Sequence, residues 1–275
     1  GSKSVTIANI TSAYDKAAQE SPKSALNEFA WDEAEIARAK KYGTLTSDLH
    51  TDLHECLGHG SGQLLPTTAP NSLGEYNSTL EEARADLFAL YYLADKKLVE
   101  LGILPDNEAY KAEFDSYIRN GLFTQFSRVE LGKTNTEAHM QNRKLIAEWC
   151  YEKGAANNVI EKKSRDGKTY FVVNDYEALR GLFGELLAEI QRIKSEGDFK
   201  AGKALVEKYA IHIDYDLHKE VRERYAELQL KPYGGFVNPD IVPVEKNGKI
   251  VDYAVVPCES FLKQQLEYGR KYATL

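Results

Sequence analysis

The segment "TSDLHTDLHECLGHGSG" (residues 46–62) combines a helical repeat of leucines with a cluster of metal-binding side chains. The leucines recur at every fourth residue, which predicts a helix over 46–58 with one buried stripe and Ser47 as its N-cap. His54 and His59 are five residues apart. On a regular helix this spacing turns two side chains roughly 140° away from each other. Both histidines can reach one ion only if the helix is locally distorted.

Gly58 lies at the place where this distortion must occur. A single π-type turn brings positions five apart onto one face, and glycine, which has no Cβ, tolerates unusual dihedral angles. Gly60 and Gly62 follow directly, so the helix can also loosen or end there. We therefore predict a bulged or unwound turn over 56–59.

His50 offers a second pairing with His54, because these residues are four apart and fit an undistorted helix. Thr51 follows His50, so this pair has no carboxylate beside its first histidine. We interpret His50 as a partly exposed helix residue or an outer hydrogen-bond partner, with metal ligation as the alternative.

A third metal ligand is expected in "EEARAD" (81–86), at the start of a second helix. A catalytic zinc usually takes three protein ligands and keeps a fourth position for water. Either Glu81 or Glu82 could be this ligand. Both also fit a capping box, in which an acidic residue of the first turn serves only the helix. Asp86, four residues past Glu82, can accept a hydrogen bond from a metal-bound histidine and orient it.

Glu55 would supply the chemistry of such a site. Zinc lowers the pKa of a bound water to roughly 7, so a carboxylate beside His54 can take the proton and pass it to a leaving amine. The alternative for Glu55 is a solvated residue on the surface of a helix.

The remaining sequence predicts a mainly α protein with two β-hairpins, in the α+β class. Residues 3–27 are expected to form an irregular lead-in with one short helix. Asp166-Gly167 and Asn247-Gly248 are expected to form the tight turns of the hairpins. Helices are expected over 31–43, ending at Gly43, and over 77–102, 106–132, 134–153, 175–195, 198–209, 214–229 and 259–273.

The composition bounds the class of protein. The chain has 275 residues, a formal charge of −7 and a hydrophobic fraction of 43%, which is ordinary for a globular protein. Scattered basic residues argue against nucleic acid as a partner, and no apolar run is long enough to span a bilayer. Cys56, Cys150 and Cys258 are too widely spaced for a disulfide framework. We expect a cytoplasmic protein without nucleic-acid or membrane partners, whose cysteines are small buried hydrophobes.

Taken together, "HECLGH" (54–59) and "EEARAD" (81–86) resemble the paired signatures of the dipeptidyl peptidase III family, the M49 zinc metallopeptidases. The family motifs are H-E-x-x-G-H and E-E-C-[RQ]-A-[ED]. The first matches at every fixed position, and the second departs only at Ala83. Similar stretches at "EAHMQNR" (137–143) and "KSEGDFKAGKALVEKYA" (194–210) extend the resemblance over most of the region from 46 to 230. The amino-acid sequence of these stretches is most similar to that of bacterial, Bacteroides-type members.

This resemblance implies one zinc ion per chain, with His54, His59 and Glu82 as its ligands. It implies that Glu55 is the general base of a peptide hydrolysis. His139 is implied to face the cleft and to stabilise the tetrahedral intermediate.

The resemblance also implies supporting residues around the ion. Glu81 and Asp86 would hold the histidine rings as outer hydrogen-bond acceptors. Arg143 lies four residues after His139, on the same face of a helix, and is expected to approach the substrate or an acidic partner. Without the resemblance, His139 would be interpreted as an ordinary surface histidine.

Members of the family are longer and have two lobes with a cleft between them. The resemblance therefore implies that residues 3–275 form one helical, zinc-binding catalytic lobe, after an expression-tag remnant at 1–2. The N-terminal substrate-binding lobe of the parent polypeptide would be absent. The parent would release dipeptides from the N-terminus of short peptides, and the isolated chain is expected to be weakly active or inactive.

Two alternatives remain at this point. One is a non-catalytic helical binding module whose zinc is structural or lost. A structural zinc site is closed by four protein ligands and has no use for a base such as Glu55. The other is a different peptidase type, an endopeptidase or a monoaminopeptidase, against which only the paired motifs argue.

Overall fold

The computed structural model describes residues 23–230, 238–256, 258 and 260–273. The contacts divide the chain into two compact units, of which the larger, here called the helical unit, includes Ala25–Gln229. The second unit includes Leu230–Leu275. The predicted lead-in lies mostly outside the described residues. The prediction of one catalytic lobe over 3–275 stays a prediction.

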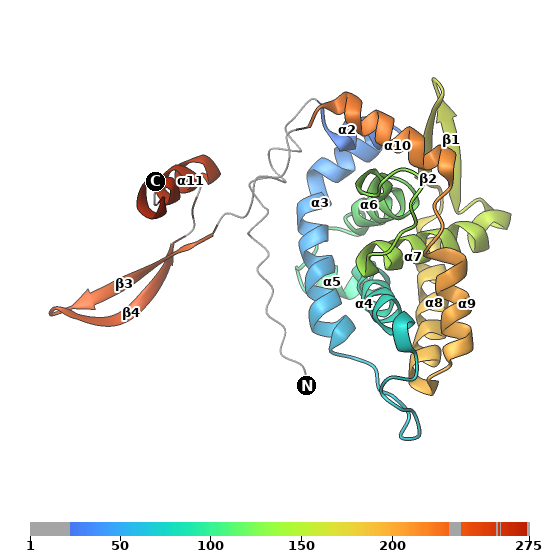
Figure 1. The fold of residues 1–275 in the computed structure, drawn as a ribbon, viewed down its shortest axis with the longest axis horizontal. Coiled ribbons are helices and arrows are strands. Elements are labelled where there is room, and N and C mark those ends of the chain that lie inside the picture. The colour runs from blue at the N-terminus through green and yellow to red at the C-terminus, as the bar shows by residue number, and fades with distance from the viewer. Residues whose placement is uncertain (1–22, 231–237, 257, 259, 274–275) are drawn as a thin grey trace. The chain divides into compact units, whose positions relative to one another are not determined.

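The helical unit is built from ten helical segments and one hairpin among its described residues (Figure 1). Its elements are α2 (Ala25–Phe29), α3 (Glu33–Leu53), the π-helical turn η2 (His54–His59), α4 (Asn77–Leu93), α5 (Lys96–Glu100), α6 (Tyr110–Leu122), α7 (Ala138–Gly154), β1 (Ile160–Arg165), β2 (Lys168–Val173), α8 (Tyr176–Glu196), α9 (Phe199–Tyr209) and α10 (Tyr215–Leu228). Short 3₁₀ turns join them at η3 (Gly74–Tyr76), η4 (Thr124–Arg128) and η5 (Ala155–Asn157).

The second unit contains β3 (Asp240–Lys246), β4 (Lys249–Val256) and α11 (Phe261–Tyr272). Both hairpins are antiparallel and two-stranded. Each turn has the two positive φ angles of a type I′ turn: 53° and 76° at Asp166 and Gly167, and 51° and 72° at Asn247 and Gly248. The predicted hairpins and the mainly α fold class are therefore confirmed.

Helix α4 occupies the centre of the helical unit, and this places the "EEARAD" motif inside the protein. It contacts α3, η2, α7 and α8. A helix with neighbours on several sides must be apolar over most of its surface. The side chains that α4 buries completely are Leu80, Ala83, Ala85, Leu87, Ala89, Leu90 and Leu93. The polar side chains of α4 are therefore surrounded by the helices that pack against it.

The predicted end of a helix at Gly43 is wrong, because α3 continues through it to Leu53. A glycine inside a helix costs about 1 kcal/mol relative to alanine. Helix α3 packs against α4 and α6, and this packing outweighs the local preference. The N-cap is Asp32, whose Oδ1 accepts a hydrogen bond from the backbone of Glu35 at 2.9 Å. Ser47 lies inside the helix and is not a cap.

Replacing Asp32 by alanine should lower the free energy of unfolding by about 1 kcal/mol, because an orphan N–H at the start of α3 loses its acceptor. The matched change Ser47→Ala should stay within about 0.5 kcal/mol of the unchanged chain. Urea unfolding of the two variants checks this. If Ser47→Ala lowered the free energy of unfolding more than Asp32→Ala, the helix start with Ser47 as N-cap that the sequence predicts would be supported instead.

Two further predicted helices are shorter than expected. The helix expected over 77–102 is broken after Leu93, since the carboxylate of Asp95 caps α5 by accepting from Lys97 N at 2.9 Å. The helix expected over 106–132 ends at Leu122 and continues as the 3₁₀ turn η4. Short polar side chains such as aspartate compete with the helix for backbone donors, which explains the first break.

Candidate metal centre

The distortion predicted between the two histidines is present. Residues His54–His59 form a π-helical turn, which begins two residues before the predicted one. The rings of His54 and His59 consequently approach each other, with centroids 4.6 Å apart and planes at 89°. Leu57 lies within this turn and is 48% exposed, so the predicted leucine stripe ends at Leu53.

Gly58 is needed for a reason different from the one that the sequence suggested. Its φ is not among the positive values, so the turn does not demand glycine for its dihedral angles. A Cβ at this position would lie 2.8 Å from the Cα of Ala85 and 2.9 Å from its carbonyl oxygen. The absence of a side chain therefore lets η2 rest directly on the backbone of α4, beside the second motif.

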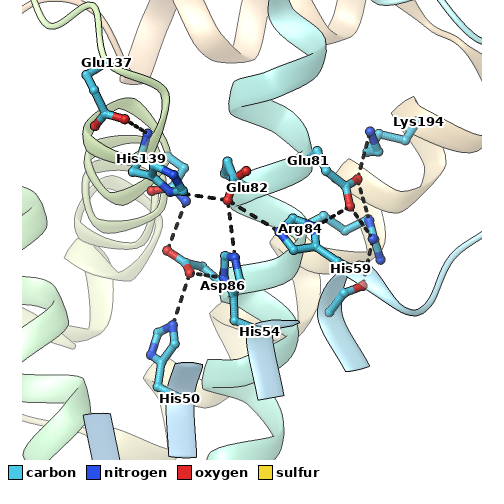
Figure 2. A network of polar contacts seen from close by, with 12 residues as sticks. His50, His54, His59, Glu81, Glu82, Arg84, Asp86, Glu137, His139 and Lys194 are labelled. Carbon is cyan, nitrogen blue, oxygen red and sulfur yellow. Dashed lines mark hydrogen bonds and ion pairs between the residues drawn. The ribbon is translucent and has the colours of Figure 1, made fainter. Parts of the chain in front are cut away.

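Three imidazole nitrogens surround one oxygen of Glu82 (Figure 2). Glu82 Oε2 lies 3.3 Å from His54 Nε2, 3.6 Å from His59 Nε2 and 3.3 Å from His139 Nδ1. This oxygen is buried and has no hydrogen-bond partner. Two atoms that bind zinc tetrahedrally at about 2.0–2.2 Å lie about 3.3–3.6 Å apart. His54, His59 and Glu82 therefore have the donor types and separations that fit a divalent cation.

Carboxylates of α4 hold the other ring nitrogen of both histidines. His54 Nδ1 lies 2.6 Å from Asp86 Oδ1, and His59 Nδ1 lies 2.9 Å from Glu81 Oε1. A Nδ1–H that donates to a carboxylate leaves Nε2 with its lone pair. In both rings this free nitrogen is the one near Glu82. Glu81 and Asp86 thus lie where the sequence placed outer acceptors.

The contacts within the cluster favour a protonated His54 and an ionised Glu82. Burial lowers the pKa of His54, but the hydrogen bond with Asp86 and the ion-pair contact with Glu82 outweigh this effect and raise the pKa to about 9. The nearby ring of His54 lowers the pKa of Glu82. A cation that binds here must displace a proton, so its affinity falls in acid.

Two basic residues fix Glu81. Arg84 Nη2 donates to Glu81 Oε1 at 2.7 Å and to the carbonyl oxygen of Gly58 at 2.8 Å. Lys194, from α8, lies 3.0 Å from Glu81 Oε2. Burial raises the pKa of Glu81, but Arg84 and His59 outweigh it and bring the pKa to about 2. Neither basic residue is among the site residues that the sequence predicts. Arg84 had a signal, because it lies inside the second motif.

A cavity of about 350 Å³ opens beside the cluster. Glu55, His54, His139 and Arg143 all line it. The side chain of His139 is 54% exposed, so it is reachable from solvent. The structure thus brings the predicted base, the predicted oxyanion donor and Arg143 to one polar cavity.

His50 is buried, with 8% of its surface exposed, so the expectation of partial exposure is wrong. Its Nε2 lies 3.1 Å from Asp86 Oδ1, the position of an outer hydrogen-bond partner. The expectation for the cysteines holds only for Cys150, which is buried. Cys56 is exposed, and Cys258 is intermediate.

Every helix of the described ranges is too short or too polar to cross a membrane.

Comparison with known proteins identifies the family. The sequence profile of peptidase family M49 matches residues 1–74 and 67–258. Among curated proteins, Nudix hydrolase 3 of Arabidopsis thaliana is 34% identical over 167 residues, 58% of this chain and 19% of that protein. Dipeptidyl peptidase 3 of Nematostella vectensis is 25% identical over 251 residues, 76% of this chain and 33% of that protein. The chain thus spans a third or less of the length of these relatives.

Solved structures show the same fold. DPP III from Caldithrix abyssi aligns with a TM-score of 0.59 at 21% identity, over 81% of this chain and 39% of that one. Dipeptidyl-peptidase III from Corallococcus sp. strain EGB aligns with a TM-score of 0.55 at 21% identity, over 79% of this chain and 38% of that one. With a family profile that covers most of its sequence, the chain belongs to peptidase family M49.

Proposed function

We propose that this chain is the zinc-binding catalytic lobe of a dipeptidyl peptidase, and that His54, His59 and Glu82 hold one zinc ion. The observation that carries the proposal is the convergence of their three ligand atoms. The separations of 3.3 and 3.6 Å from Glu82 Oε2 match those expected of atoms that share an ion, which supports the proposal. Membership of a peptidase family makes a peptide the natural substrate.

Each residue around the cavity has its own role in the proposed hydrolysis. Zinc, when bound, lowers the pKa of water to about 7 and polarises the peptide carbonyl. Glu55 takes the proton from the attacking water and delivers it to the nitrogen of the leaving amine. His139 donates a hydrogen bond to the oxygen on which negative charge develops. Arg143 binds the substrate along the same wall of the cavity.

The cleavage position is proposed from the named relatives. The curated relative from Nematostella vectensis is a dipeptidyl peptidase 3. We infer that the parent protein releases dipeptides from the N-terminus of short peptides. Because this chain spans 33% of that relative, we infer that a further lobe of the parent polypeptide completes the substrate site. The isolated chain would then bind zinc yet cleave peptides weakly or not at all.

A structural zinc site is the second candidate, and one observation favours it. His139 Nδ1 lies 3.3 Å from Glu82 Oε2, which is close enough for His139 to become a fourth protein ligand. Four protein ligands would close the site and leave no position for water. The open cavity beside Glu55 supports the catalytic alternative.

Metal content separates these candidates. Elemental analysis of the purified chain should find about one zinc per chain, and dialysis against a chelator should remove it. His139→Ala should keep zinc with an affinity within about threefold of the unchanged chain, since three ligands suffice for a catalytic site. A loss of zinc from His139→Ala alone would favour the structural site. An unchanged chain that takes up no zinc from a zinc-containing buffer would contradict both.

A further inference from the structure

Asp86 receives more hydrogen bonds than the orientation of one histidine requires. Its Oδ1 lies 2.6 Å from His54 Nδ1 and 3.1 Å from His50 Nε2. Its Oδ2 accepts from the hydroxyl of Tyr117 at 2.7 Å and from Asn142 Nδ2 at 3.0 Å. The four donors come from η2, α3, α6 and α7, and the carboxylate comes from α4. One buried side chain thus joins five elements.

Among these donors, His50 is held on its other side as well. Its Nδ1 lies 3.0 Å from Glu113 Oε1 in an ion-pair contact that is not aligned as a hydrogen bond, and its ring stacks on Tyr117 with centroids 5.6 Å apart and planes at 18°. A ring placed between two carboxylates and against an aromatic face has little freedom to rotate. His50 therefore presents Nε2 to Asp86 in a fixed direction (Figure 2).

The distances argue against a second metal ion among these residues. His50, His54 and Asp86 have the chemical types of a metal-binding group. Their contacts with Asp86 Oδ1 are 3.1 and 2.6 Å, which are hydrogen-bond lengths. Ligands of one tetrahedral zinc would lie about 3.3–3.6 Å apart. The group is thus a chain of hydrogen bonds that leads to His54.

We propose that His50, held by Glu113, is a positioning residue of the zinc centre: it fixes Asp86, and Asp86 fixes the ring of His54. This inference rests on the proposed role of His54 as a zinc ligand. Outer hydrogen bonds of this kind orient a ligand before the ion arrives, and their loss typically costs about 10–100-fold in metal affinity. His50 lies one helical turn before His54, where a regular helix presents both rings to the same carboxylate.

The test compares two replacements of His50 in the 275-residue chain. His50→Phe keeps an aromatic ring against Tyr117 but removes the donor, whereas His50→Gln keeps an N–H donor near the position of Nε2. Zinc affinity is measured by competition with a chromogenic chelator. We expect about 10–100-fold weaker binding for His50→Phe and rescue to within about threefold by His50→Gln. The control is His218→Phe, because His218 is also buried but bonds to Val129 in another part of the helical unit.

A double-mutant cycle tests whether Glu113 acts through His50. Glu113→Gln alone should weaken zinc binding, because His50 loses the carboxylate that holds it. In the His50→Phe background the same change should have no further effect on zinc affinity, because the residue through which it acts is gone. If Glu113→Gln weakens zinc binding equally in both backgrounds, Glu113 does not act through His50 and this part of the proposal fails. The absorption spectrum of the cobalt-substituted chain should shift in His50→Phe and return with His50→Gln.

The outcomes separate this inference from the function on which it rests. If His50→Phe binds zinc as tightly as the unchanged chain while His54→Ala does not, the positioning role fails and the zinc site stands. If His54→Ala also binds zinc with unchanged affinity, the proposed function fails. Should circular dichroism show that His50→Phe does not fold, the decision passes to Glu113→Gln, which must then weaken zinc binding.

Discussion

Replacing Glu55 by glutamine in the full-length peptidase that we propose to contain this chain should leave one zinc bound and lower kcat by about 10²–10⁴-fold. Glutamine has nearly the same shape as glutamate but cannot accept the proton of the attacking water. Zinc should remain, because Glu55 is not among the residues that converge on Glu82 Oε2. Peptide turnover and elemental analysis of the same sample check the two halves of this statement.

Asp52→Asn is the matched control for this experiment. Asp52 is an exposed acid of α3, the helix that leads into the π-helical turn, and it does not line the cavity. Its conversion to the amide should leave both kcat and zinc content unchanged. Full activity in Glu55→Gln would refute the proposed mechanism. A loss of zinc in that variant would instead show that Glu55 belongs to the metal ligands.

Replacing Gly58 by valine should have the largest effect on the structure of the site. A Cβ at Gly58 would lie 2.8–2.9 Å from atoms of Ala85, two of which belong to the backbone of α4. Backbone cannot move aside as a flexible side chain can, so η2 must lift away from α4. We expect a loss of about 3 kcal/mol in the free energy of unfolding. Zinc affinity should fall at least about 100-fold, because His59 moves with the turn.

The control is Gly43→Val, the same substitution in the preceding helix. A Cβ at Gly43 would meet nothing within 4 Å. Valine and glycine differ little in helix propensity, so the free energy of unfolding should change by less than about 0.5 kcal/mol. Urea unfolding and chelator competition measure both variants. Equal stability and zinc affinity for Gly58→Val and the unchanged chain would show that the contact with Ala85 is not needed.

Local sequence signals predicted the elements whose cause is local. The hairpin turns follow from two dipeptides, Asp166-Gly167 and Asn247-Gly248, that favour positive φ angles. The distorted turn follows from the spacing of His54 and His59. The helix end predicted at Gly43 is wrong because the benefit of continuing α3 comes from helices that are distant in sequence, and a glycine alone carries no information about them.

The site also combines features that local sequence predicts with features that depend on segments distant in sequence. Two of the three histidines that approach Glu82 Oε2 lie in the first motif, and His139 lies in a further similar stretch, so their roles could be proposed from the sequence. Lys194 could not, because nothing near it in the chain signals that α8 brings it to Glu81. The burial of His50 likewise depends on α4 and α6, which supply Asp86 and Glu113. Such tertiary contacts between distant segments cannot be predicted from the local periodicity of the sequence.

The carboxylate of Asp86 has a consequence for the order of events during folding. Its hydrogen-bond partners are spread from residue 50 to residue 142, so no early local structure can assemble them. The oriented form of His54 should exist only after α3, α4, α6 and α7 have docked. Rapid, tight capture of zinc in stopped-flow refolding would then mark the last step of assembly, and a nascent chain would reach its proposed zinc-binding form late.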